Sequence, residues 1–163
     1  MKEIEGFWTK VCSDDFEIQE EGLGKWREFD RNHPKYFESM MERFSKKFYE
    51  TYRGKVLHDF HILNMGIICN TRPPRKTEIK MLLYDFHKDY GKDLYFHFVY
   101  IDVQAYVFCM PHTQSAVSWY KDILEVTSDN LIKHRIALTE NAYIEITCKD
   151  IHMVRAKKRE IFI

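Results

Sequence analysis

The chain has 163 residues, of which 45% are hydrophobic and 15% aromatic, and its 25 Lys and Arg residues balance 25 Asp and Glu residues. This composition excludes a disordered chain, and the length suffices for one buried core without disulfide bonds. No apolar run approaches the roughly 20 residues of a membrane span, and the polar start, Met1–Glu5, does not resemble a secretion signal. We therefore expect a single domain, 1–163, in the cytoplasm, with no membrane partner.

Charge is unevenly distributed along the chain although it sums to zero. Residues 1–33 carry a net charge of −4, residues 34–80 carry +5 and the remainder carries −1. A solvated surface whose elements differ in sign explains such modest imbalances. The alternative is a docking face for another protein. Zero net charge argues against a general nucleic-acid-binding protein, so we expect no nucleic-acid partner.

The first 54 residues are predicted to be helical. Residues 13–15, Ser-Asp-Asp, offer an N-cap with carboxylates in the first turn, where the helix dipole favours negative charge. Gly22 and Gly24 each cost about 1 kcal/mol in a helix interior relative to alanine. We therefore expect the helix to break there, before a second short helix over residues 25–31.

A third helix is predicted to begin at Pro34, because proline suits the first helical position and disfavours helical angles in the residue before it. Gly54 is the expected end of this helix. Between them, apolar side chains recur every three or four residues and indicate one buried face. These side chains are Phe37, Met40, Met41, Phe44, Phe48 and Tyr52.

After Gly54 the apolar spacing changes toward two, and Val, Ile, Tyr, Phe and Thr, which favour strands, become frequent. Two prolines mark a loop over residues 70–77. Residues 115–126 fit either a short amphipathic helix or a strand, and the sequence leaves both open. Strands are predicted over residues 56–69, 79–86, 94–110, 131–138 and 143–149, with a further strand near 151–154.

Helices first and strands afterwards, joined by short connections, predict an α+β fold. We expect N-terminal helices within residues 1–54 to pack on one face of a mostly antiparallel β-sheet or meander formed by residues 55–163. No internal repeat indicates a second domain. Four well-separated cysteines indicate free thiols rather than a disulfide framework.

The densest group of titratable residues is His58, Asp59 and His61. In an extended strand Asp59 and His61 share a face, so the carboxylate could orient the imidazole as a general base or a metal ligand. The alternative is structural: Asp59 caps a turn and His58 bonds to the backbone in the core. Without a third group to complete a site, the structural role is the more common one for such residues.

A second candidate is a zinc site formed by Cys109, His112, Cys148 and His152, because two thiolates and two imidazoles suit tetrahedral zinc. An extended strand separates Cys148 from His152 by about 13 Å, so the chain would have to turn sharply between them. Buried cysteines and surface histidines explain the same residues. We expect no cofactor, with zinc as the alternative.

Catalytic motifs with recognisable spacing do not occur in the sequence. It contains no G-x-S-x-G elbow, phosphate-binding loop, dinucleotide-binding glycine pattern or H-E-x-x-H. Two short basic groups, residues 72–76 and 157–159, lack interleaved aromatic residues, and solvation explains them better than phosphate contact.

The order of several short motifs resembles a bacterial family of small uncharacterised proteins and, more distantly, is similar to immunity-type proteins, which bind and neutralise a partner. These motifs are Phe7-Trp8-Thr9-Lys10, Leu57-His58-Asp59, Trp119-Tyr120, His134-Arg135-Ile136, Ile144-Glu145-Ile146 and Lys149-Asp150-Ile151.

Charge asymmetry and aromatic richness without catalytic spacing favour a non-enzymatic protein-binding or regulatory module. Such a module requires another protein as its partner. The alternative function is a small enzyme or metal-binding protein that uses Asp59 and His61 or the cysteine and histidine set.

Overall fold

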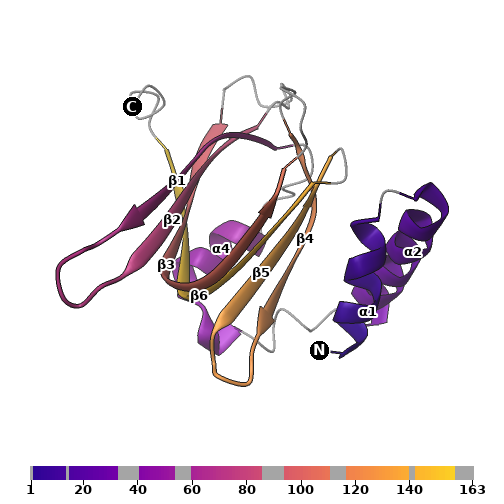
Figure 1. Cartoon of the computed structure of the whole chain (residues 1–163), viewed down its shortest axis with the longest axis horizontal. Coiled ribbons are helices and arrows are strands. Elements are labelled where there is room, and N and C mark those ends of the chain that lie inside the picture. Colours follow the sequence, from indigo (N-terminus) through magenta and orange to yellow (C-terminus); the bar gives the residue numbers. More distant parts are fainter. Residues whose placement is uncertain are drawn as a thin grey trace.

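The computed structural model of the chain describes residues 2–13, 15–32, 41–53, 60–85, 94–110, 117–139 and 142–156. The described residues form a few helices before a six-stranded antiparallel sheet, so the α+β prediction is confirmed (Figure 1). The helical elements are α1 (Lys2–Val11), α2 (Phe16–Asn32), the 3-10 turn η1 (Met41–Arg43) and α4 (Lys46–Arg53). The strands are β1 (His61–Cys69), β2 (Thr77–Asp85), β3 (Leu94–Cys109), β4 (Trp119–Val126), β5 (Ile132–Leu138) and β6 (Tyr143–Arg155).

The sheet consists of two three-stranded meanders placed side by side. Its strand order is β1-β2-β3-β6-β5-β4, so β6 lies between β3 and β5. A simple meander would instead place β4 beside β3. The sheet curls until its edges meet at one end, where the Trp119 N–H donates to the Phe60 carbonyl (2.7 Å) and the Ile62 N–H donates to the Val117 carbonyl (3.3 Å).

The inner face of the curled sheet holds the main core and encloses α4 (Figure 1). Phe48 of α4 is 1% exposed and meets Phe98 of β3 edge-on, with 6.2 Å between the ring centroids. The strands contribute alternate residues to this face, as a sheet with one buried side requires. Its buried members include Ile79, Met81, Leu83, Phe96, Phe98, Tyr100, Ile132, Ile136, Ile144 and Ile146.

The α1–α2 hairpin packs on the outer face, over β4 and β5, so helices lie on both faces of the sheet rather than on one. Phe7, Trp8 and Trp26 form a second buried cluster with Ile123 and Ala137. This is possible because neighbouring residues of a strand point to opposite faces: Ile123 and Ala137 are buried outward while their neighbours enter the main core. None of the described helices is long and apolar enough to cross a membrane.

Helix α2 runs without a break through Gly22 and Gly24, so the predicted interruption is wrong. A Cβ atom added to Gly22 would lie 2.6 Å from the Val11 backbone nitrogen. Gly22 therefore lets α1 pack closely against α2, and this packing outweighs the glycine's low helix propensity. The predicted cap is confirmed at Asp15, whose Oδ1 accepts the N–H groups of Glu17 (2.9 Å) and Ile18 (3.2 Å).

Several other helix and strand boundaries differ from the predicted ones or lie outside the described residues. The helix expected to reach Tyr52 is interrupted after η1 and restarts as α4, where the Ser45 hydroxyl accepts the Phe48 N–H (3.2 Å). The start expected at Pro34 and the stop expected at Gly54 lie outside the described residues. The ambiguous segment contains strand β4, and the short strand expected near 151–154 continues β6.

Candidate functional site

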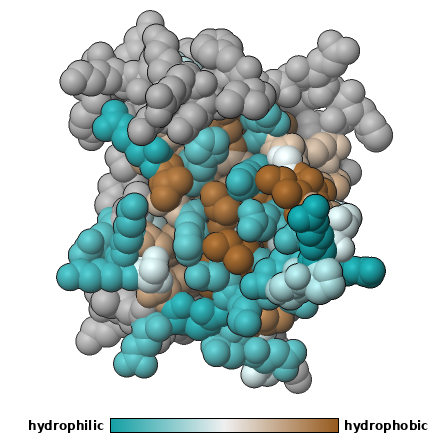
Figure 2. All heavy atoms as spheres, turned by 90° about the vertical axis from the view of Figure 1, so that its left-hand side faces the viewer, coloured by the Kyte–Doolittle hydropathy of each residue, from teal (hydrophilic) through white to brown (hydrophobic). Residues whose placement is uncertain are grey.

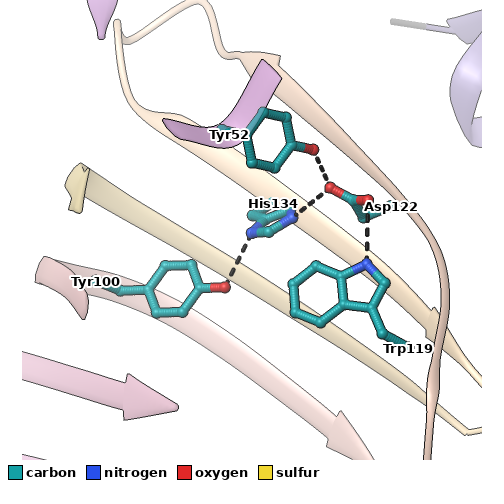
Figure 3. Close-up of polar contacts among 5 residues, drawn as sticks. All are labelled: Tyr52, Tyr100, Trp119, Asp122 and His134. Atoms are coloured by element: carbon teal, nitrogen blue, oxygen red, sulfur yellow. Dashed lines mark hydrogen bonds and ion pairs between the residues drawn. The ribbon is translucent and has the colours of Figure 1, made fainter. Parts of the chain in front are cut away.

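Four polar side chains meet on the inner face, between α4 and the sheet (Figure 3). We call Tyr52, Tyr100, Asp122 and His134 the inner polar cluster. His134 of β5 lies at the centre, with Nε2 3.0 Å from the Asp122 Oδ2 atom and Nδ1 2.9 Å from the Tyr100 hydroxyl. Tyr52 of α4 donates to the same Asp122 oxygen, and the Trp119 Nε1–H donates to Oδ1 (3.1 Å).

The protonation of the inner polar cluster follows from its burial. Removal from water holds the pKa of Tyr100 well above its usual range, and the nearby Cys148 and Asp122 raise it further. The Tyr100 phenol therefore keeps its proton. In the tautomer that carries its proton on Nε2, His134 accepts a hydrogen bond from the Tyr100 hydroxyl at Nδ1 and donates one to Asp122. Asp122 then accepts three hydrogen bonds, and each group of the cluster has a partner.

A tyrosine, a histidine and an aspartate in contact could relay a proton, but the two groups at the centre of this cluster are closed to solvent. Tyr100 and His134 are 0% exposed. The rings of Trp119 and Phe98 pack against the imidazole with centroids 5.5 and 5.8 Å away. A general acid or base must reach the proton that it transfers. The cluster therefore fastens α4 and β4 to the centre of the sheet.

A buried ion pair holds the outer face under the α1–α2 hairpin. Arg135 is 0% exposed, and its Nε lies 3.1 Å from Oε1 of Glu125, which is equally enclosed. Glu145 approaches the same guanidinium (3.9 Å), and Trp8 of α1 covers it with 5.8 Å between Cζ and the ring centroid. Removing either partner of such a pair would leave the other charge buried without compensation, so the free energy of unfolding depends on both being present.

The first candidate predicted from the sequence falls only partly in the described chain. His58 and Asp59 lie outside it, so their relation to His61 stays a prediction. His61 is half-buried at the start of β1, where its Nδ1 lies 3.0 Å from the Ser118 hydroxyl. This contact is beside the backbone bonds that join β1 to β4, so His61 belongs to the seam between the two sheet edges.

The structure does not bring Cys109, Cys148 and His152 together, and His112 lies outside the described residues. Cys109 pairs across the ladder with Tyr143, five positions before Cys148 and therefore about 16 Å away along the strand. Cys148 points into the core, and burial raises its pKa to about 12. His152 is exposed and 3.2 Å from Asp150. Across the described ranges no three metal-ligating side chains converge.

The outer face of β1, β2, β3 and β6 carries a different feature, a hollow of about 580 Å³. We call it the outer hollow; its lining residues are Asn64, Gly66, Ile68, Lys80, Leu82, His97, Val99 and Val154. Apolar side chains separated by polar ones are visible on this side of the molecule in Figure 2. A volume of this size falls in the range of about 300–1,000 Å³ that is typical of ligand sites.

Strand register explains why the face is hollow at this point. Gly66 of β1 lies opposite Lys80 of β2, and Lys80 lies opposite Val99 of β3. A Cβ atom added to Gly66 would meet nothing within 4 Å, so the space above this position is open. Lys80 is exposed and has no ion-pair partner in the part of the chain that the structure describes, and it lines the hollow together with Leu82 and Val99.

The outer hollow continues into a basic turn between β1 and β2. A second hollow of about 450 Å³ shares Ile68 with the outer hollow, and its charged lining residues are Arg72, Lys76 and Glu78. Arg72, Arg75 and Lys76 are all exposed, and Glu78 is the acidic residue nearest to them in sequence. The combination of an apolar floor and a cationic end suits a ligand that is apolar at one end and anionic at the other.

Known proteins give no further guide to either site. Comparisons of the chain with protein-family models, with curated proteins and with solved structures find no match. The functional argument therefore rests on the inner polar cluster, which is enclosed, and on the outer hollow, which is open.

Sequence reasoning missed both sites. Asp122 and His134 stand beside other charged residues of their strands, Lys121 in β4 and Lys133 and Arg135 in β5, so their residue types alone indicate a satisfied core group as readily as a functional one. Gly66 lies in a regular ladder with β2, opposite Lys80. A glycine inside a predicted strand was the available signal for the outer hollow.

Proposed function

We propose that this protein is a non-enzymatic module that binds another protein through the outer hollow and thereby regulates or neutralises it. The observation that carries the proposal is the contrast in accessibility: Tyr100 and His134 are buried inside the sheet, whereas the open surface offers apolar contacts beside Lys80, which has no ion-pair partner among the described residues. Open apolar surface beside polar groups is typical of protein-binding sites.

Strand β1 exposes large aliphatic side chains. Ile68, which lines the outer hollow, is 48% exposed, and Leu63 and Ile67 are 47% and 43% exposed; Ile67 lies on the opposite face of the strand, across from Ile79 of the main core. His61 to Asn70 carry no Asp, Glu, Lys or Arg. A hydrophobic strand without charged residues to protect it favours association with another chain.

Strand β1 is also an edge of the sheet. Past its contact with β4 at Ile62, β1 pairs with β2 and with no second strand among the described residues. Its outward backbone groups can therefore accept an extended segment of a partner, which would gain main-chain hydrogen bonds. The basic turn that includes Arg72 and Lys76 favours a partner segment with acidic residues next to apolar ones.

The test is capture of the partner from the native host with three versions of the tagged chain. Gly66→Trp fills the outer hollow without a clash, because space above Gly66 is open. Gly6→Trp is the matched control, since Gly6 is an exposed glycine of α1 that also has open space around it. We expect one protein to co-purify in near-equal amount with the wild type and with Gly6→Trp, and to fall at least about tenfold with Gly66→Trp, a loss of about 1.4 kcal/mol in binding.

Two results would overturn the proposal. One is the same set of co-purifying proteins, or none, from all three versions. The other is reproducible turnover of a small substrate by the wild-type monomer. The unfolding midpoint of Gly66→Trp in urea, which we expect to equal or exceed that of the wild type, shows that lost capture reflects a blocked surface.

A further inference from the structure

We propose that the outer hollow accepts the start of α2 from a second copy of this chain, so that the protein associates head to tail. This inference rests on the binding surface of the proposed function and names one occupant for it. It starts from a second exposed apolar feature, at residues 15–20, whose charge is opposite to that of the outer hollow.

The first turn of α2 is unusually apolar for a solvent-facing helix end. Phe16 is 72% exposed and Ile18 is 43% exposed, the former being the most exposed large apolar side chain among the described residues. Glu17 and Glu20 beside them are exposed and take part in no ion pair across the described ranges. Asp15 adds a third carboxylate while it caps the helix.

The outer hollow provides the complementary features. Leu82 and Val99 offer apolar contacts for an aromatic side chain, and the open space above Gly66 admits it. Lys80 stands beside that space, and the adjoining hollow is lined by the exposed Arg72 and Lys76 and by one acidic residue, Glu78, so its charge is positive on balance. An apolar residue flanked by carboxylates therefore meets an apolar hollow flanked by cations, and both components of the contact favour binding.

The two surfaces cannot meet within one molecule. Helix α2 and the β1–β2 hairpin lie at opposite sides of the structure in Figure 1. A contact between them must join two copies through different surfaces, and such a contact repeats from copy to copy unless the rotation closes a ring. Because the contact area of one helical turn is small, we expect association in the micromolar to millimolar range and weakening with added salt.

The experiment measures molar mass by sedimentation equilibrium as a function of concentration for the wild type and two blocked variants. Phe16→Glu removes the inserted side chain but leaves the outer hollow intact; Gly66→Trp fills the outer hollow but leaves α2 intact. We expect the mass of the wild type to rise with concentration and each variant to remain a monomer. An equal mixture of the two variants should form a dimer that grows no further, because it contains one intact surface of each kind.

The mixture makes the result specific. Three results would overturn the inference. Either variant could associate as the wild type does, the mixture could stay monomeric, or the mass of the wild type could remain constant up to millimolar concentration. Gly6→Trp is the matched control and should associate as the wild type does. If the chain is monomeric throughout yet loses its captured host partner in Gly66→Trp, this inference fails and the proposed function stands. If no host protein is captured but the mixture of variants dimerises, the proposed function fails and this inference stands.

Discussion

The inner and outer faces of the sheet differ in how accessible their polar side chains are to solvent. On the inner face His134 hydrogen-bonds to both Tyr100 and Asp122, and Tyr100 and His134 are withdrawn from solvent. On the outer face Lys80 stands beside an empty hollow, and the neighbouring β1 exposes aliphatic side chains. The comparison teaches that a cluster of titratable residues is a functional candidate only when something can reach it, and here the reachable surface is the apolar and basic one.

The strongest test of the inner face is Asp122→Ala. This change leaves the Tyr52 hydroxyl, the His134 Nε2–H and the Trp119 Nε1–H without their acceptor. We expect a loss of about 3–5 kcal/mol in the free energy of unfolding, because each buried donor left unsatisfied costs about 1–3 kcal/mol. Urea unfolding measures it, with the neighbouring Lys121→Ala as a control. A loss below about 1 kcal/mol would show that the cluster does not hold the sheet together.

Breaking the ion pair on the outer face should cost nearly as much. Glu125→Leu leaves Arg135 buried without its closest carboxylate, and we expect a loss of about 3 kcal/mol. Adding Arg135→Met should restore at least half of that loss, since two apolar side chains pack where a broken pair cannot. Unfolding in urea compares the single and double variants. A double variant that is no more stable than the single one contradicts a buried pair at this position.

A pair of glycine substitutions separates close helix packing from helix propensity. Gly22→Ala places a methyl group against the backbone of Val11, and we expect a loss of about 2 kcal/mol. Gly24→Ala meets nothing within 4 Å and should gain about 0.5–1 kcal/mol. Thermal unfolding of both variants measures the two signs. Equal effects at the two positions would mean that α1 and α2 are not in close contact at Gly22.

Alkaline pH should weaken the core through Cys148. Burial raises the pKa of its thiol from 9.0 to about 12, so the unfolded chain loses this proton first as pH rises. The contribution is therefore fully present below about pH 9 and is lost as pH approaches 12. Urea midpoints measured from pH 8 upward should fall, and Cys148→Ala should reduce the slope. An unchanged slope would assign the alkaline loss to other groups, such as Tyr100.

The smallest effect expected is a difference in thiol reactivity that leaves stability unchanged. Cys69 and Cys109 are exposed, whereas Cys148 is buried and Cys12 is half-buried with a pKa raised to about 12, first by burial and then by the Glu145 carboxylate. Thiolate is the reactive form, so a disulfide reagent at neutral pH should modify two thiols at least about tenfold faster than the others. Four thiols of equal rate would contradict the burial of Cys148.

The sequence predicted the fold class well, because the change from helical to strand spacing after Gly54 reflects how each element buries its apolar side. It predicted the strands of both hairpins, since β2, β3, β5 and β6 fall close to the expected ranges. It did not predict that β6, rather than β4, pairs with β3. Placing β6 next to β3 depends on packing between distant segments, and no local pattern records that.

The candidate sites were harder to predict than the fold. Burial decides whether His134 is catalytic or structural, and burial depends on Phe98 and Trp119, which lie on other strands. Of the proposed zinc ligands, Cys148 and His152 do not converge, because Cys148 is buried in the core whereas His152 is exposed on the other side of β6; His112 lies outside the described residues. A hollow above Gly66 requires three neighbouring strands in register, which spacing along one strand does not show.

Amide hydrogen exchange on the captured complex tests the central claim most directly, namely that this protein works through its outer face. The account predicts that binding slows exchange along β1 from Leu63 to Cys69 and around Lys80, while amides of β5 beside His134 are slow with or without the partner. Slowed exchange confined to β4, β5 or α4, with no change along β1, would contradict it and return attention to the inner polar cluster.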